Sequence, residues 1–87
     1  TSASIVSGAS TLTTTAYAES PLIISVGTTV IWRNNDNTAH TSTANGGAWD
    51  SGVIQPSGQF SFAFQSRGTF PYHCTIHPNM VGTVNVQ

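Results

Sequence analysis

The chain has 87 residues, of which 38% are hydrophobic and 6% are charged, and its formal net charge is -1 at pH 7. This length suffices for one modest hydrophobic core, so we expect a single domain over residues 1–87. The low charge excludes a charge-rich disordered chain and a basic nucleic-acid binder. No apolar run approaches the roughly 20 residues that a membrane-spanning helix needs.

Alternating apolar and polar residues predict an all-β chain. In chain order, the expected strands are residues 4–8, 21–27, 28–34, 59–65, 69–74 and 82–87. Short segments rich in Gly, Pro, Asn and Ser separate these strands and predict turns. No segment has a convincing apolar period of 3.6 residues, so helices should be short or absent. Several short strands at this spacing predict a sandwich or a barrel.

The same alternation predicts which side chains face the core. Phe60, Phe62 and Phe64 share one face of their strand and should all point inward. Pro71 lacks the N–H that a strand needs, so the strand over residues 69–74 should be paired irregularly there or lie near a sheet edge. Trp32 and Trp49 are expected to pack in the core or under a loop.

Cys74 is the only cysteine of the chain and stands at the end of an expected strand. A single cysteine cannot form an internal disulfide, and an exposed free thiol is a liability outside the cytoplasm, so in an exported protein we expect it to be buried or bound to a metal. Strand phase places Cys74 on the inner face and His73 on the outer face, so His73 should not share a metal with it. An inert core cysteine, a catalytic thiol, a zinc ligand and a copper ligand all remain open at this point.

Cys74, His77 and Met80 stand three residues apart in a tight loop, in which Pro78 fixes the chain just past His77. Side chains with this spacing can converge on one point. Thiolate, imidazole and thioether form a soft mixed set that suits copper better than magnesium, calcium or manganese. A trigonal copper site needs a second imidazole, and His40, in the loop after the strand over 28–34, is the candidate.

Three segments resemble the small blue copper proteins, the plastocyanin and amicyanin family of cupredoxins. "GTFPYHCTIHPNMVGTVNV" resembles the family's terminal copper-loop strand pair, and within it "YHCTIHPNM" is similar to the amicyanin type of loop. "VGTTVIWRNNDNTAH" resembles the strand and loop that carry the first His ligand, and "WDSGVIQPSGQFSFAF" is similar to a further segment of these proteins. The resemblance covers residues 20–86 and implies a Greek-key, cupredoxin-like β-sandwich with copper near one end.

The resemblance implies a role for each matching residue. His40, Cys74 and His77 would be the equatorial ligands of one copper ion, and Met80 would be the weak axial ligand. Sites with two His, one Cys and an axial Met serve electron transfer. We therefore expect a mononuclear type 1 copper protein that cycles between Cu(I) and Cu(II), a one-electron carrier between redox partners rather than an enzyme.

The resemblance also guides the expectations for partners and location. A redox-partner protein should dock near His77 through a small apolar patch made of Ala39, Ile76, Pro78 and Val81. Nothing in the sequence demands more than a monomer. The Ser- and Thr-rich start suits an exported surface, so we expect an extracytoplasmic protein, periplasmic or on the cell surface. A membrane anchor in a full-length precursor is compatible with that expectation.

Three positions depart from the family pattern. Ala39 and Ile76 stand where proline is common, and Thr41 stands where an Asn commonly ties the two ligand loops together. The Thr41 N–H could still donate to the Cys74 sulfur, and its hydroxyl could reach Thr75. The added backbone freedom could also leave the copper with an open coordination position.

Two other function classes therefore stay in view. An open position would suit a copper redox enzyme or a sensor that binds a small molecule such as nitric oxide or nitrite. A structural or storage module would hold zinc or Cu(I) with the same residues. Cysteine-protease chemistry is not expected, because Cys74 and His77 lie too close on one loop to be oriented independently and 87 residues leave little room for a substrate cleft.

Overall fold

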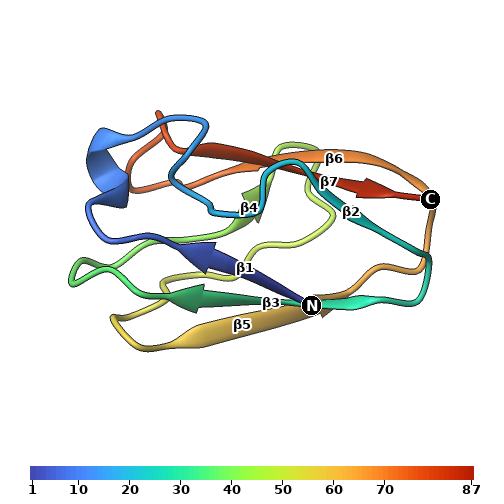
Figure 1. Cartoon of the computed structure of the whole chain (residues 1–87), viewed down its shortest axis with the longest axis horizontal. Coiled ribbons are helices and arrows are strands. Elements are labelled where there is room, and N and C mark those ends of the chain that lie inside the picture. The colour runs from blue at the N-terminus through green and yellow to red at the C-terminus, as the bar shows by residue number, and fades with distance from the viewer.

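The computed structural model describes all of residues 1–87 and folds them into two facing β-sheets (Figure 1). The elements in chain order are β1 (Ser2–Ile5), the 3-10 helix η1 (Ala9–Thr11), β2 (Leu22–Ile24), β3 (Thr29–Asn34), β4 (Thr43–Ala44), β5 (Gln59–Ala63), β6 (Gly68–His73) and β7 (Val81–Val86). The all-β Greek-key sandwich expected from the sequence is confirmed, and the single helical segment is one short turn. No helix here has both the length and the apolar character that crossing a membrane requires.

Each sheet brings together strands that are far apart in the sequence. One sheet has the order β1-β3-β5 and the other the order β2-β7-β6-β4. β1 runs parallel to β3 and β2 runs parallel to β7, whereas β6 and β7 form an antiparallel pair. The loop that joins β6 to β7 lies at the left end of Figure 1, together with η1 and the loop after β3. The topology therefore gathers three connecting segments at one end of the sandwich.

The expected strands are all present, with different ends. The largest differences are at residues 4–8 and 21–27, where the structure has Ser2–Ile5 and Leu22–Ile24. Strand β4 was not anticipated, because its two residues are too few to show an alternating pattern. It pairs with the end of β6, next to the position of Cys74.

The core between the sheets is aromatic at its centre. Trp32 and Trp49 are buried, with ring centroids 5.4 Å apart. Tyr72 is also buried and packs edge-on against Trp32, with centroids 5.5 Å apart. Both tryptophans are thus packing residues, as expected, and contacts of this kind contribute beyond the area that they bury.

The three phenylalanines of the stripe that includes β5 pack against the core, as expected, but only one of them is fully buried. Phe64, just past β5, is 1% exposed, whereas Phe60 and Phe62 are partly buried and pack against the edge of the core. The physical reason is that β5 is the edge strand of its sheet, so its inner face is open on one side. An open apolar pocket of about 160 Å³ lies beside Phe62 and Phe70.

Pro71 occupies a position in β6 where its missing N–H is tolerated. Its Cα pairs with Thr83 of β7, and its carbonyl accepts a hydrogen bond from the Asn45 N–H on the β4 side. The N and C=O of one residue in an antiparallel strand point to the same side, so the Pro71 nitrogen also faces that side, where the short β4 has ended. The predicted position near a sheet edge is therefore confirmed, although β6 itself lies between β7 and β4.

Candidate metal centre

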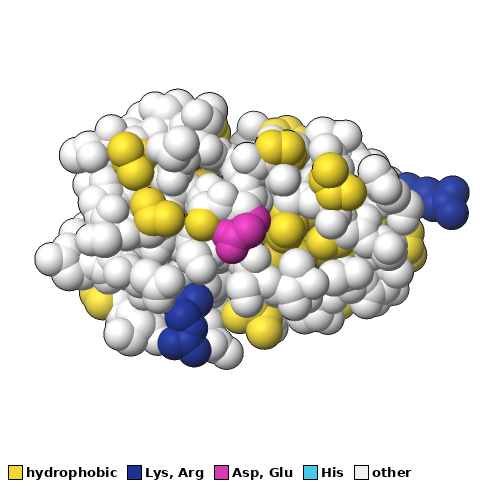
Figure 2. Space-filling view, viewed as in Figure 1, with side chains coloured by type: hydrophobic (Ala, Val, Ile, Leu, Met, Phe, Trp, Pro, Cys, Tyr) yellow, Lys and Arg dark blue, Asp and Glu magenta, His cyan; other side chains and the backbone are white.

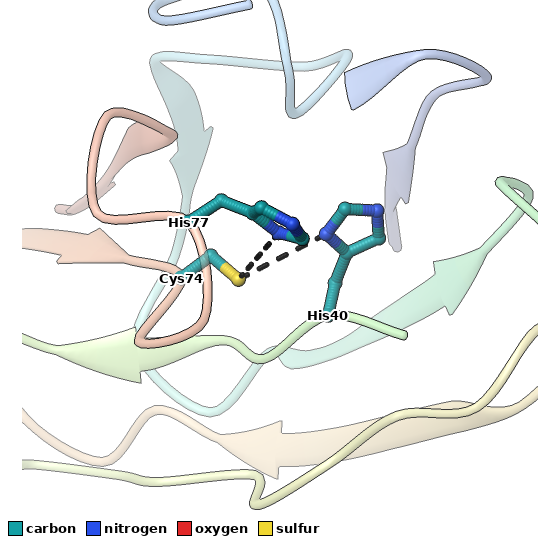
Figure 3. Close-up of side chains that lie close together, drawn as sticks. All are labelled: His40, Cys74 and His77. Atoms are coloured by element: carbon teal, nitrogen blue, oxygen red, sulfur yellow. Dashed lines mark hydrogen bonds between the residues drawn. The ribbon is translucent and has the colours of Figure 1, made fainter. Parts of the chain in front are cut away.

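Two imidazole rings and one thiol converge from two loops at one end of the sandwich. His40 lies in the loop after β3, Cys74 directly follows β6, and His77 lies three residues further along. The Nδ1 atom of His40 is 3.8 Å from the Cys74 sulfur, and the Nδ1 atom of His77 is 3.9 Å from it (Figure 3). One potential ligand atom from each of the three residues lies within 4.8 Å of the others.

These separations suit one small metal ion. Nitrogen and sulfur ligands bind the first-row ion Zn²⁺ at about 2.0–2.3 Å, so two such ligands 120° apart around one ion are about 3.7 Å from each other. The two nitrogen–sulfur distances around Cys74, 3.8 and 3.9 Å, are close to that value. The arrangement of these atoms is therefore close to the one that a trigonal site with two imidazoles and one thiolate would need.

Met80 belongs to the same closed loop as Cys74 and His77. Its residue exposure is 0%, and it lies at the base of the loop just before β7. The Cys74 N–H donates to the Met80 carbonyl over 3.2 Å, and the Met80 N–H donates to the His77 carbonyl over 2.9 Å. These turn hydrogen bonds hold all three residues of the sequence motif in one short loop.

Burial divides the converging residues into two kinds. His40 and Cys74 are both 0% exposed, whereas His77 is half-buried. The neighbouring Ile76 is 46% exposed. His77 is therefore the one residue of the three through which the site reaches the surface.

Thr41 ties the two loops together. Its backbone N–H donates to the Cys74 sulfur over 3.3 Å, which links the loop of His40 to the loop of Cys74 and His77. Its hydroxyl oxygen accepts the Thr75 N–H over 2.9 Å and also lies 3.1 Å from the Thr43 hydroxyl. Both contacts expected of Thr41 are confirmed, so the tie between the ligand loops survives without the Asn that is common in the resembling proteins.

Asp36 contacts the far side of the His40 ring. Its Oδ2 atom lies 2.7 Å from the Nε2 atom of His40, and both side chains are buried. Its Oδ1 atom accepts the backbone N–H groups of Gly8, at 3.1 Å, and Asn37, at 2.9 Å. The hydrogen bond with His40 is the main cause that lowers the pKa of the Asp36 carboxyl below its ordinary value, and burial works against it.

Asn34 fixes the conformation of the loop that carries His40. Its side-chain amide donates to the carbonyls of Thr38, over 2.8 Å, and Ile54, over 2.9 Å, and its Oδ1 atom accepts the Asp36 N–H over 2.9 Å. His40 and Ile54 also exchange two backbone hydrogen bonds. The sequence predicts a loop here that carries His40, but no local pattern in "NNDNTAH" marks Asn34 or Asp36 as a site residue.

The hydroxyl of Tyr17 anchors the next residue of this loop. It donates to the Thr41 carbonyl over 2.7 Å. Tyr17 is fully buried, and its ring packs edge-on against Tyr72 with centroids 4.6 Å apart. Burial raises the pKa of the Tyr17 hydroxyl far above its ordinary value, so this donor stays protonated at neutral pH.

His73 and Trp49 lie outside the converging group. The His73 ring contacts the Asn45 side chain and takes no part in the cluster of His40, Cys74 and His77, as its outward strand position predicts. The Trp49 indole N–H donates to the Ser42 hydroxyl over 3.0 Å, and its ring packs within the aromatic core.

The fold has a close counterpart among solved structures. A purple cupredoxin from Nitrosopumilus maritimus superposes with a TM-score of 0.90 at 30% sequence identity, over 99% of this chain and 98% of that one. The chain belongs to the cupredoxin family. No protein-family model matches the sequence of this cupredoxin.

Amicyanins are also similar to this cupredoxin. The amicyanin of Paracoccus denitrificans is 33% identical to it, over a match that includes 82% of this chain and 58% of that protein. The chain thus spans less than two thirds of that relative. An amicyanin variant solved in its Cu(I) form superposes with a TM-score of 0.83 at 27% identity, over 99% of this chain and 80% of that one.

Proposed function

We propose that this cupredoxin is a mononuclear type 1 copper protein that carries one electron at a time between redox partners. The observation that carries the proposal is the convergence of the His40 and His77 imidazoles on the buried Cys74 thiol. The similarity to a purple cupredoxin, and to an amicyanin solved with Cu(I), supports the same conclusion.

The ligand assignment follows from the donor atoms. His40, Cys74 and His77 would hold the ion, and Met80 would be a fourth, weaker ligand. A soft mixed set of nitrogen and sulfur donors fits copper, and a bound copper ion supplies a one-electron Cu(II)/Cu(I) couple at one fixed position. Cys74, His40 and Met80 are each 0% exposed, which favours a closed carrier over the alternative of an enzyme or sensor that binds nitric oxide or nitrite at copper.

The chain's own residues hold the candidate ligands in place. Asn34 and Asp36 hold the loop of His40, and Thr41 fixes the Cys74 sulfur relative to that loop. A site whose ligands are already held in place needs little rearrangement when the charge changes, which suits fast electron transfer. The half-buried His77 gives the short route from the site to a partner.

A redox partner docks beside His77 on a small apolar patch made of Ala39, Ile76, Pro78 and Val81. All four residues are at least partly exposed, and Ile76 is 46% exposed. The chain has only two basic and three acidic residues, and the face drawn in Figure 2 shows few charged side chains. A small apolar contact with little electrostatic attraction suits a brief encounter and rapid release, and the protein itself acts as a monomer.

The proposal includes a single copper domain over residues 1–87 and an extracytoplasmic location, periplasmic or at the cell surface. The complete burial of the only thiol supports that location, because an exposed free cysteine is a liability in an oxidising compartment. Attachment of a longer precursor to a membrane stays a prediction.

The test is to add Cu(II) to the metal-free protein and record visible absorption and electron paramagnetic resonance. The proposal predicts an intense thiolate-to-copper band with small copper hyperfine splitting. The absence of such a band would return Cys74 to the role of a core residue.

A second arm of this test adds azide or nitrite to the copper-loaded protein. A closed carrier site predicts that the intense band does not move. A band that shifts with the anion would show an open position and would support the enzyme or sensor reading instead. Tight binding of Zn²⁺ without a stable Cu(II) form would support the storage reading.

A further inference from the structure

The contact between Asp36 and His40 fixes which nitrogen of the His40 ring carries the proton. The Oδ2 atom of Asp36 lies 2.7 Å from Nε2, and an ionised carboxylate can only accept a hydrogen bond. Nε2 is therefore the protonated nitrogen. In the neutral ring this leaves the lone pair on Nδ1, the atom that lies 3.8 Å from the Cys74 sulfur.

The two oxygens of Asp36 have separate roles. Oδ1 alone accepts the backbone N–H groups of Gly8 and Asn37, so it supplies the hydrogen bonds that shape the turn. Oδ2 contacts His40. A turn of this kind needs only one acceptor atom, which an Asn side chain would also provide. The second, charged oxygen is thus directed specifically at the ring.

Asp36 is also unusual among the acidic residues of the chain. There are three of them, and Asp36 is 6% exposed, whereas Glu19 and Asp50 lie on the surface. A buried carboxylate is costly unless it is hydrogen-bonded or paired. A negative charge held beside a metal-binding imidazole raises the basicity of that ligand, as carboxylate partners of metal-bound histidines do in general.

We propose that Asp36 is a positioning residue that holds His40 in the Nε2–H tautomer and favours the oxidised over the reduced copper ion. The inference rests on the proposed copper function. A negative charge held 2.7 Å from the His40 ring stabilises Cu(II) more than Cu(I), because the oxidised ion carries the larger charge. Asp36 therefore lowers the reduction potential of the site.

The decisive substitution is Asp36→Asn. The new side chain can keep its oxygen at the Gly8 and Asn37 N–H groups, and its NH₂ group then faces Nε2 of His40. An NH₂ group donates, so it favours a bare Nε2 and a protonated Nδ1, which is the wrong tautomer for binding metal through Nδ1. Asp50→Asn is the matched control, because Asp50 makes the same kind of turn contacts, to Gly52 and Thr43, and touches none of the proposed ligands.

The first measurement uses the metal-free protein and ¹⁵N NMR of the imidazole nitrogens, under conditions in which the rings are neutral. Wild type and Asp50→Asn should show a protonated Nε2 and a bare Nδ1 at His40, whereas Asp36→Asn should show the reverse. A protonated Nδ1 in wild type would overturn the proposal. That result needs no variant, so the test stands even if Asp36→Asn fails to fold.

The second measurement compares the affinities of the same three proteins for Cu(II) and Cu(I), together with their reduction potentials. Loss of a partner that orients a ligand typically lowers metal affinity about 10- to 100-fold, and we expect Asp36→Asn to lose more Cu(II) than Cu(I) affinity. Each tenfold loss of Cu(II) affinity relative to Cu(I) affinity raises the reduction potential by about 59 mV for a one-electron couple.

The outcomes separate this inference from the function on which it rests. If Asp36→Asn and Asp50→Asn shift the potential equally while wild type shows the intense copper band, Asp36 has no special role and the copper function stands. If wild type shows no intense band, the proposed function fails, whatever the NMR result for the His40 tautomer.

Discussion

The two loops that supply the candidate ligands are built in different ways. The first, residues 34–41, is held by buried side chains: Asn34 and Asp36 hydrogen-bond within the loop and to Ile54 and Gly8. The second, residues 74–80, is mostly exposed and is held by turn hydrogen bonds and by Asn79, whose side chain donates to the carbonyls of Ser10 and Leu12.

The two loops correspond to two different requirements of an electron-transfer site, which is the function proposed for this protein. A ligand set must be rigid to limit rearrangement, and one ligand must reach the surface to limit the distance to a partner. The buried loop of His40 meets the first requirement, and the exposed loop of His77 meets the second. Cys74 is buried at the root of the second loop and is hydrogen-bonded to the first through Thr41, so it joins the two.

The largest effect is expected where the two loops meet. Cys74→Ala should abolish the intense visible band of the copper-loaded protein, because the thiolate that produces it is gone. His73→Ala, one residue earlier and on the opposite face, should leave the band intact. Visible absorption of both variants after Cu(II) addition checks this. An intense band in Cys74→Ala would refute its assignment as a ligand.

The difference in burial between the two histidines predicts a difference in chemical rescue. Both His40→Gly and His77→Gly should lose the native copper spectrum. Added imidazole should restore it in His77→Gly, whose gap opens to solvent, and not in His40→Gly, because His40 is 0% exposed. Titration of both variants with imidazole, followed by visible absorption, measures this difference. Equal rescue of both variants would contradict the conclusion that the His40 loop is closed to solvent and the His77 loop is open to it.

Substitution of the asparagine that anchors each loop should lower the stability of the protein by different amounts. Asn34→Ala removes three hydrogen bonds, to the carbonyls of Thr38 and Ile54 and from the Asp36 N–H, at a buried position, so it should lower the free energy of unfolding by about 3 kcal/mol. Asn79→Ala acts at an exposed position and should lower it by about 1 kcal/mol. Urea unfolding of the metal-free proteins measures both. The reverse order would show that the second loop is the more firmly held.

A pH-dependent effect concerns the Tyr17 anchor of the first loop. Burial raises the pKa of Tyr17, so the unfolded chain loses this proton above about pH 10 while the folded chain keeps it. The free energy of unfolding should therefore fall as pH rises past about 10, by about 1.4 kcal/mol per pH unit for each such tyrosine. Tyr17→Phe should fall less steeply than wild type, because the similarly buried Tyr72 still contributes.

Urea unfolding of the metal-free proteins at neutral pH and at several pH values above 10 checks this difference in slope. Tyr17→Phe also loses the hydrogen bond to the Thr41 carbonyl, which lowers stability equally at every pH where the tyrosine is protonated. A constant gap between the two proteins across the alkaline range would contradict the raised pKa of Tyr17.

The second loop could be predicted from the sequence much better than the first. The spacing of Cys74, His77 and Met80 is local, so a short turn alone can bring these residues together. Strand alternation likewise predicts the inward position of Cys74 and the outward position of His73. These features depend on neighbouring residues, and the sequence displays them directly.

The surroundings of the first loop depend on contacts between distant residues. Asp36 binds the N–H of Gly8, 28 residues away, and Tyr17 reaches Thr41, 24 residues away. Neither contact follows from a period or a turn motif, because each requires the packing of η1 and β1 beside the loop after β3. The partial burial of Phe60 and Phe62 escaped prediction for the same reason, since alternation gives the face of a strand but not its place at the edge of a sheet.

The most direct test of the central claim is X-ray absorption at the copper edge on the copper-loaded protein, compared with Cys74→Ala. The ligand assignment predicts one sulfur at short distance and two imidazole nitrogens around copper in wild type, and loss of the short sulfur in the variant. A wild-type spectrum with only nitrogen and oxygen ligands would contradict it.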